Sequence, residues 1–207
     1  MRYEEGKTPQ LVDIEQVSDG WIPKYILHYR LPDGTMHRYE SVSRKGLDDY
    51  RRELESLARG EKPPTDAVCI VPQTPDGTLV LIREFRYPLN SWVVAFPAGL
   101  VDAGEDAVES VDRELREETG FALRRDVEHP LEMLPQVGFS SPGCTDETIQ
   151  IAFAQVERVA DATPEESELI VPFELAITDI PRFLAENKLP ISVRAQLILD
   201  GFARYGA

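Results

Sequence analysis

The apolar residues between positions 10 and 46 come in short runs separated by turn residues, a pattern typical of β-strands. One run covers residues 21–30, and another passes Tyr39 and ends at Val42. Between them lies Leu31-Pro32-Asp33-Gly34, and residues of these types favour tight turns. We therefore predict a hairpin. A hairpin this small is marginally stable alone and needs a partner surface.

The chain divides at Gly60-Glu61-Lys62-Pro63-Pro64, which has the composition of a linker. Residues 47–59 before it are predicted to form a short helix. We expect an N-terminal β region over residues 1–60, used for dimerisation, and a main domain over residues 65–207. In the main domain, strands are predicted over residues 67–71, 79–83, 92–96, 131–137, 148–156 and 169–175. Helices are predicted over residues 106–119, 178–186 and 191–204. Strands that alternate with few helices indicate an α+β fold or a mixed α/β sandwich.

Composition excludes several classes of function. The net charge of −15 repels nucleic-acid backbones, so DNA or RNA partners are not expected. No apolar run is long enough to cross a bilayer, and the first residues lack the apolar core of a signal peptide, so we expect a cytoplasmic protein without membrane partners. The spacing of the three histidines argues against zinc, and the two cysteines argue against a disulfide framework. Cys69 lies in an apolar run and is predicted to be in the core.

The helix predicted over residues 106–119 has two contrasting faces. Its predicted buried stripe consists of Val108, Val111, Leu115 and Thr119. Glu114, Glu117 and Glu118 share a different face near the C-terminal end, which is unfavourable for anions in the helix dipole. Each like-charge neighbour also costs roughly 0.2–0.5 kcal/mol. Folding alone gives no reason for this cluster, whereas a bound Mg²⁺ does, since it prefers oxygen ligands.

The residues around this helix support a metal site. Arg113 lies one turn from Glu117 and can orient the carboxylates by hydrogen bonding. Gly99 and Gly104 permit a tight loop before the helix. Glu105, near the helix start, is placed favourably in the dipole. A solvated acidic helix face is the alternative interpretation, but it does not explain this loop.

Residues 99–121 match every defined position of the Nudix signature G-x5-E-x7-R-E-U-x-E-E-x-G-U, in which U is bulky and apolar. The matching residues are Gly99, Glu105, Arg113, Glu114, Leu115, Glu117, Glu118, Gly120 and Phe121. Nine positions at fixed spacing make a specific motif. The chain therefore resembles the Nudix superfamily over most of residues 14–204.

Within that superfamily, the chain resembles the ADP-sugar pyrophosphatases. The segments that carry this likeness are Arg83-Glu84-Phe85-Arg86-Tyr87-Pro88, Phe96-Pro97-Ala98-Gly99-Leu100 and Ser140-Ser141-Pro142-Gly143-Cys144-Thr145. The resemblance implies an α/β/α sandwich with a mixed sheet and a small N-terminal antiparallel β domain. It also implies a homodimer whose subunits exchange their N-terminal domains.

The resemblance implies a set of metal ligands. Glu114 and Glu118 would be the main ligands of Mg²⁺, with Glu117 assisting and the carbonyl of Ala98 adding a further oxygen. Mn²⁺ is the expected substitute ion. Arg113, Glu117 and Glu118 are predicted catalytic residues on the helix.

The resemblance also implies a substrate site for a nucleoside diphosphate compound. Trp21 and Tyr39 would stack on the adenine, while Arg44 and Arg86 would hold the diphosphate. Glu168, from an acidic loop over residues 161–168, would be the catalytic residue that activates water.

Several points stay open. Glu165 or Glu166 are alternatives to Glu168. The subfamily often has a glutamate where this chain has Ala95, so one contact to metal or water is missing. Residues 122–129 form a longer stretch than usual, which could change the accepted leaving group.

Three functions compete at this stage. The first is Mg²⁺-dependent hydrolysis of ADP-ribose to AMP and ribose 5-phosphate. The second is hydrolysis of GDP-mannose, UDP-glucose, a dinucleoside polyphosphate or an oxidised nucleotide. The third is a Nudix-fold module that senses a nucleotide without cutting it, which usually lacks the metal-binding glutamates that this chain retains.

Overall fold

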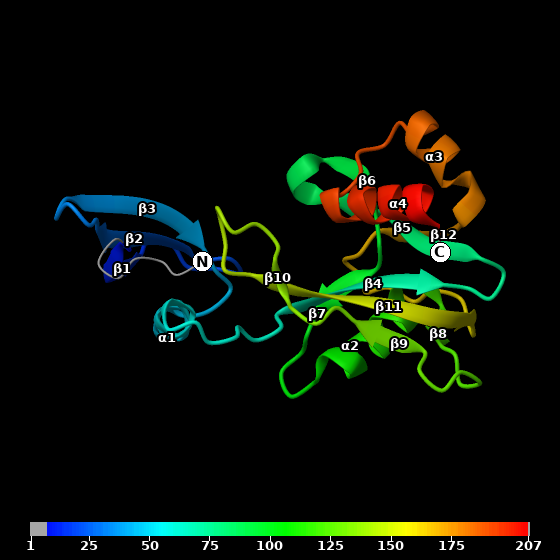
Figure 1. Cartoon of the computed structure of the whole chain (residues 1–207), viewed down its shortest axis with the longest axis horizontal. Coiled ribbons are helices and arrows are strands. Elements are labelled where there is room, and N and C mark those ends of the chain that lie inside the picture. The colour runs from blue at the N-terminus through cyan, green and yellow to red at the C-terminus, as the bar shows by residue number, and fades with distance from the viewer. Residues whose placement is uncertain (1–7, 207) are drawn as a thin grey trace. The chain divides into compact units, whose positions relative to one another are not determined.

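The computed structural model describes residues 8–206, and their contacts divide the chain into two compact units. The N-terminal unit contains the residues up to Pro64 together with Val137–Ile149. The large unit contains Thr65–Gln136 and the chain from Gln150 onwards (Figure 1). The segment Val137–Ile149 therefore packs with residues that precede it by about a hundred positions rather than with its sequence neighbours.

The N-terminal unit contains an antiparallel sheet in the order β1 (Gln10–Gln16), β2 (Lys24–Arg30) and β3 (Met36–Val42). The predicted hairpin is thus confirmed as β2 and β3. Its first strand begins at Lys24 rather than at residue 21, directly after Pro23, which has no backbone N–H to donate to a ladder.

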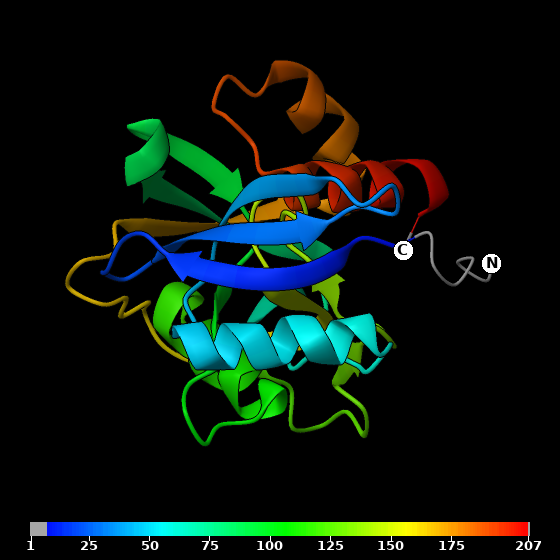
Figure 2. The ribbon, with the colours of Figure 1, turned by 90° about the vertical axis from the view of Figure 1, so that its left-hand side faces the viewer.

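Helix α1 (Leu47–Ala58) confirms the predicted helix and lies along the sheet of the N-terminal unit (Figure 2). Tyr50 from this helix packs with Tyr25 and Leu27 of β2 and with Ile14 of β1 in one buried cluster. The Tyr25 and Tyr50 rings are 4.8 Å apart. The helix supplies the partner surface that the hairpin needs.

The segment Val137–Ile149 joins this unit through backbone hydrogen bonds. Strand β10 (Gly138–Phe139) pairs with the first residues of β11 (Thr148–Arg158). Val42, at the end of β3, forms a parallel bridge with Thr145, and its N–H donates to the carbonyl of Cys144 at 3.0 Å.

The large unit is built on a sheet in which β11, β4, β5 and β12 are successive neighbours. Its other strands are β4 (Ala67–Gln73), β5 (Thr78–Arg86), β6 (Ser91–Ala95), β7 (Ala98–Leu100), β8 (Phe121–Leu123), β9 (Leu131–Met133) and β12 (Ile170–Ala176). Its helices are η1 (Tyr87–Leu89), α2 (Ala107–Glu114), η2 (Leu115–Thr119), η3 (Ile177–Asp179), α3 (Ile180–Glu186) and α4 (Val193–Tyr205). No helix of the described chain is both long and apolar enough to span a membrane.

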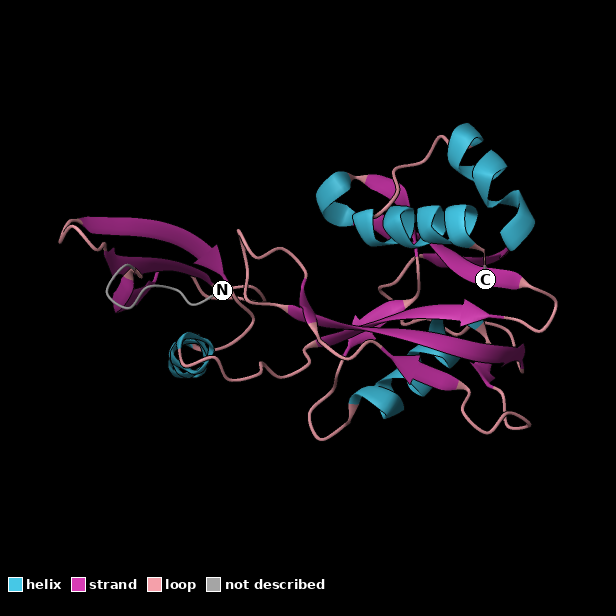
Figure 3. Ribbon diagram, viewed as in Figure 1, coloured by secondary structure: helices cyan, strands magenta, loops and turns pink. Residues whose placement is uncertain are grey.

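Helices cover both faces of this sheet, with α2 on one side and α3 and α4 on the other (Figure 3). Val111 and Leu115 pack against Val68, Ile70 and strand β11 on the α2 side. Cys69 points to the opposite face and is buried, as predicted. Two buried faces explain why β4 is apolar at nearly every position.

The helix predicted over residues 106–119 is present but changes form. It is α-helical over Ala107–Glu114 and continues as a π-helical turn over Leu115–Thr119. Asp106 caps its start in a reciprocal capping box with Glu109, and Gly120, with φ of 75°, ends it. π-helical turns are rare and frequently occur at functional sites.

Two sequence predictions about side chains and bounds were wrong. Val108 was expected in the buried stripe but is 49% exposed, because Ala107 faces the core instead. The strand predicted over residues 131–137 ends at Met133, two residues before Pro135, which cannot donate to a ladder. Val111, Leu115 and Thr119 are buried as expected.

Candidate active site

The π-helical turn η2 and the helix before it place two carboxylates inside the large unit. Glu114 is 8% exposed and Glu118 only 2% exposed, while the Glu117 side chain remains partly accessible. The predicted acidic face is therefore a mostly buried one. Burial of ionised carboxylates is strongly unfavourable unless a compensating charge is present.

The pKa of Glu118 is strongly shifted by its surroundings. Burial raises its pKa well above the usual range, and the neighbouring carboxylate of Glu114 raises it further. The backbone N–H of Ala98 donates to Glu118 Oε2 at 3.0 Å and partly opposes this shift in pKa. Glu84 and Glu168 act in the same direction as Glu114. The site thus concentrates negative charge around Glu118.

Glu114 approaches the strand that precedes the helix. A Cβ atom added to Gly99 of β7 would overlap the Glu114 carboxylate, so a larger residue here would force that carboxylate to move. Burial raises the pKa of Glu114, whereas its ion pair with Arg113 at 2.7 Å lowers it. Gly99 in the signature therefore allows the Glu114 carboxylate to lie directly against the backbone of β7.

Arg113 holds the carboxylates of this segment together. Its guanidinium donates to both oxygens of Glu105, at 3.1 and 3.0 Å, and to Glu114 Oε1 at 2.7 Å. It also donates to Glu117 Oε2 at 3.2 Å and to the carbonyl of Leu100 at 3.0 Å. The hydrogen bond from Arg113, followed by that from Ser110, lowers the pKa of Glu105 to about 2. The loop and the helix of the signature are joined by this one side chain.

The acidic loop ends beside strand β5. The N–H of Phe85 donates to the carbonyl of Leu169 at 3.0 Å, and the Tyr87 hydroxyl lies 3.4 Å from the carbonyl of Ser167. Glu168 lies between these two anchors. Its carboxylate accepts the N–H of Glu165 at 3.2 Å. Glu168, the predicted water-activating residue, is also close enough to Glu118 to raise its pKa. In this structure the Glu168 side chain caps a turn of its own loop.

Sequence reasoning missed Glu84, which belongs to the same region. It lies on β5, is 9% exposed, and forms an ion pair with Arg86 at 2.8 Å. Burial raises its pKa, and Arg86 lowers it. The available signal was a glutamate shortly after an apolar run. In this segment a role was predicted only for Arg86.

Of the four predicted substrate-binding residues, three belong to the N-terminal unit, namely Trp21, Tyr39 and Arg44. Trp21 is 74% exposed. The Tyr39 hydroxyl donates to the carbonyl of Gly143 at 2.7 Å, and Arg44 forms an ion pair with Glu147. The large unit holds Ala98, Arg113, Glu114, Glu117, Glu118, Glu168 and Arg86.

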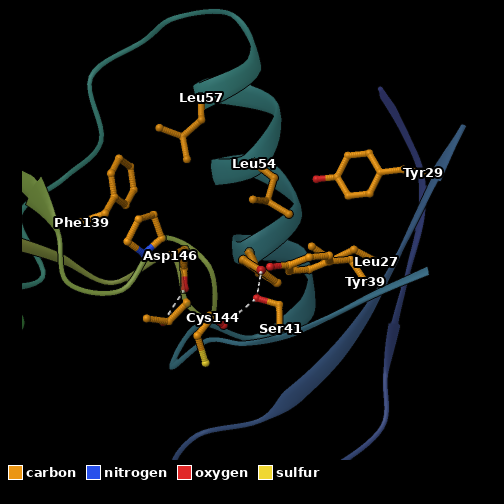
Figure 4. Close-up of a pocket in the computed structure, with 12 residues that line it drawn as sticks. Leu27, Tyr29, Tyr39, Ser41, Leu54, Leu57, Phe139, Cys144 and Asp146 are labelled. Carbon is orange, nitrogen blue, oxygen red and sulfur yellow. Dashed lines mark hydrogen bonds between the residues drawn. The ribbon is translucent and has the colours of Figure 1, made fainter. Parts of the chain in front are cut away.

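Tyr39 lines a cavity of about 400 Å³ within the N-terminal unit (Figure 4). The aromatic side chains around it include Tyr29, Tyr50 and Phe139. Ser41 lies 2.7 Å from the Tyr50 hydroxyl and donates to the carbonyl of Cys144 at 3.1 Å. Trp21 and Arg44 are outside its lining. Of the predicted residues in this unit, only Tyr39 faces the cavity.

A second feature that the sequence did not indicate is a buried ion-pair network in the N-terminal unit. The Lys45 ammonium lies 3.0 Å from Glu53 Oε2 of α1 and 3.0 Å from Asp146 Oδ2. The Ser43 hydroxyl donates to the same oxygen of Asp146 at 3.0 Å. This network connects the segment Val137–Ile149 to β3 and α1.

The donor set around Glu118 fits a divalent metal ion. Several carboxylates are buried next to one another with raised pKa values, and a hard cation would relieve their repulsion. Among the residues that the structure describes, no three His, Cys, Asp or Glu side chains are already arranged as a metal-binding group. Arg113 and the Ala98 N–H hold the carboxylates instead, so these side chains would have to reorient to ligate an ion.

Known proteins resemble this chain in sequence, and a solved structure resembles it in fold. A family model described as NUDIX domain matches residues 63–191. The ADP-ribose pyrophosphatase of Bacillus subtilis (strain 168) is 27% identical over 169 residues, which cover 77% of this chain and 86% of that protein. The ADP-ribose pyrophosphatase of Saccharomyces cerevisiae (strain ATCC 204508 / S288c) is 26% identical over 184 residues, covering 86% and 74%. A crystal structure of ADP compounds hydrolase superposes with a TM-score of 0.69 at 22% identity, covering 96% of this chain and 97% of that chain. The predicted fold class is confirmed.

Proposed function

This chain belongs to the NUDIX domain family and is a Nudix hydrolase, and we propose that its reaction is the hydrolysis of ADP-ribose to AMP and ribose 5-phosphate. The observation that carries the proposal is the buried pair Glu114 and Glu118, held against Ala98 and Gly99. The likeness to two ADP-ribose pyrophosphatases over most of the chain supports the substrate.

Nudix hydrolases use divalent metal ions, and we propose Mg²⁺ here, with Mn²⁺ as its substitute. Glu114, Glu118, Glu117 and the Ala98 carbonyl would hold it. Bound there, the ion would neutralise charge on the diphosphate and acidify water. Arg113 would keep the carboxylates in place, since it already contacts Glu114 and Glu117.

Residues of the large unit would also handle the substrate and the water. Arg86 would bind the diphosphate, because its guanidinium is about half exposed while its Nε is anchored on Glu84. Glu168 would orient the water and accept its proton after release from its turn. Glu165 and Glu166 of the same loop are the alternatives.

The N-terminal unit would complete the site of a partner subunit in a homodimer. Trp21 and Tyr39 would stack on adenine, and Arg44 would contact the diphosphate. The exposure of the apolar residues Val12, Val17, Trp21, Ile22 and Met36 on this unit supports an interface. A two-fold arrangement would cover both units with one self-complementary surface.

A panel of nucleotide compounds with Mg²⁺ tests the reaction. We expect ADP-ribose to be hydrolysed fastest, with AMP and ribose 5-phosphate as products, and a chelator to stop turnover. Much faster turnover of GDP-mannose, UDP-glucose or a dinucleoside polyphosphate would contradict the substrate. Binding without turnover of any compound would indicate a sensing module instead.

The shared site is tested by mass and by complementation. Sedimentation is expected to give twice the 23.3 kDa chain mass at micromolar concentration. Mixed dimers of Glu118→Gln and Arg44→Ala subunits are expected to regain activity, because one hybrid site receives both intact residues. A monomer, or no rescue in confirmed mixed dimers, would contradict the shared site.

A further inference from the structure

Glu84 is a buried carboxylate that follows the apolar run of strand β5. Residues Leu79 to Ile82 of β5 are all at most 1% exposed, and Glu84 follows two positions later at 9%. In the sheet it lies between Val93 of β6 and Ile170 of β12. Burial of a carboxylate between apolar neighbours is unfavourable, so its retention calls for a compensating role.

The ion pair with Arg86 provides local compensation. Residues two apart on a strand point to the same face, so Glu84 and Arg86 are side by side, with Glu84 Oε1 2.8 Å from Arg86 Nε. The Glu84 side chain is 12% exposed, and the Arg86 side chain is 52% exposed. Arg86 therefore has one end fixed by a buried group while its terminal nitrogens remain accessible.

This pair lies close to the other acidic segments of the large unit. The two residues next to Arg86 both hydrogen-bond to the end of the acidic loop. The N–H of Phe85 donates to the carbonyl of Leu169, and the Tyr87 hydroxyl donates to the carbonyl of Ser167. Strand β5 also contacts the η2 turn that carries Glu118. Glu84 is thus located where the acidic loop and the η2 turn both approach β5.

We propose that Glu84 is a positioning residue for Arg86, holding its guanidinium ordered beside the carboxylate centre before substrate arrives. The inference rests on the proposed role of Arg86 in binding the diphosphate. An arginine that is ordered beforehand loses less conformational entropy when it binds phosphate oxygens. Two explanations compete with this one. In the first, the ion pair only stabilises the fold. In the second, Glu84 affects substrate binding only through its negative charge.

The sign of one substitution separates these explanations. Glu84→Gln keeps the size and one acceptor oxygen but removes the charge. If Glu84 acted only through its negative charge, removal of that charge would strengthen the binding of an anionic substrate. If it positions Arg86, KM for ADP-ribose is expected to rise roughly tenfold while kcat changes less. In an Arg86→Gln background, the same change should add nothing.

A matched control is available where helix α1 meets the linker. Arg59 and Glu61 are also two residues apart and form an Nε-to-carboxylate ion pair at 2.6 Å, on the exposed surface of the N-terminal unit. Glu61→Gln is expected to leave KM and kcat unchanged. Thermal unfolding of both variants shows whether either change acts through stability.

A readout without turnover completes the test. The arginine Nε–H signal of Arg86, assigned with Arg86→Lys in a ¹⁵N-labelled chain, is expected to exchange with water roughly tenfold faster in Glu84→Gln, since the charge-assisted hydrogen bond is weakened. Equal exchange in the two proteins would overturn the proposal, as would a lower KM.

Calorimetric titration with ADP-ribose in the presence of a chelator separates this inference from the proposed function. A wild-type chain that binds ADP-ribose but never hydrolyses it would contradict the proposed function alone. Unchanged affinity in Glu84→Gln would contradict the role of Glu84 alone. Weaker binding in Glu84→Gln, absent in Glu61→Gln, supports it.

Discussion

The two units both bury carboxylates, but they balance the charge differently. In the N-terminal unit, Glu53 and Asp146 each contact the Lys45 ammonium at 3.0 Å, and Asp146 also accepts the Ser43 hydroxyl. In the large unit, Glu118 receives one backbone N–H, and the side chains that shift its pKa are other carboxylates. One cluster has its cation built in, whereas in the other no ion pair within the described residues involves Glu118, its most buried member.

This is the difference expected between a structural cluster and a functional one. A buried ion pair with a lysine fixes geometry and needs nothing further. Buried carboxylates that repel each other lower stability, and such an arrangement is typical of sites that bind a cation or perform chemistry. The comparison predicts that substitutions in the large unit alter activity and those in the N-terminal network alter stability.

Glu118→Gln should have the largest effect, a loss of roughly a thousandfold in kcat, because it would remove the proposed anionic metal ligand while keeping the side-chain volume. Without metal, its thermal stability should hold or rise, since like-charge repulsion is relieved. Mg²⁺ should raise the melting temperature of the wild type more than that of this variant. Unfolding of Glu118→Gln without metal would instead assign the cluster a structural role.

Lys45→Met should destabilise the chain by about 3 kcal/mol, because two buried carboxylates lose their shared cation. Chemical denaturation with a probe in the N-terminal unit measures this change. Lys24→Met, which removes the exposed pair with Glu40, is the control and should have a much smaller effect. Equal effects in the two variants would remove the distinction between the buried network and a surface pair.

Glu168→Gln should reduce kcat by about a hundredfold with less effect on substrate binding, as expected for a group that acts on water. Steady-state kinetics with ADP-ribose provides the measurement. Glu165→Gln and Glu166→Gln are the matched controls from the same loop. A larger loss in either control would transfer the role to that residue.

Asp106→Ala should cost about 1 kcal/mol of stability, because Asp106 accepts the N–H groups of Val108 and Glu109 at the start of α2. Asp106→Asn retains a capping side chain and should be close to wild type. Thermal unfolding compares the three proteins. A large loss of kcat in Asp106→Asn would show that this cap also contributes to the chemistry.

The sequence alone determined the parts of this protein that depend on short-range patterns. Asp106 and Gly120 marked the ends of the helix, and Leu31 to Gly34 marked the hairpin turn, because caps and turns depend on local backbone chemistry. The nine signature positions identified the family, since their spacing fixes which side chains share a face. Cys69 was correctly placed in the core because its neighbours are apolar on both faces of the strand.

The tertiary structure decided which charges meet. Asp146 lies 101 positions from Lys45, and no local pattern indicates that the two form an ion pair. Glu84 is buried in a sheet where it pairs with residues of β6 and β12, and Val108 is exposed because Ala107 turns toward the core. Burial and ion pairing depend on elements brought together from distant parts of the chain, and a pattern with a period of two to four residues does not contain that information.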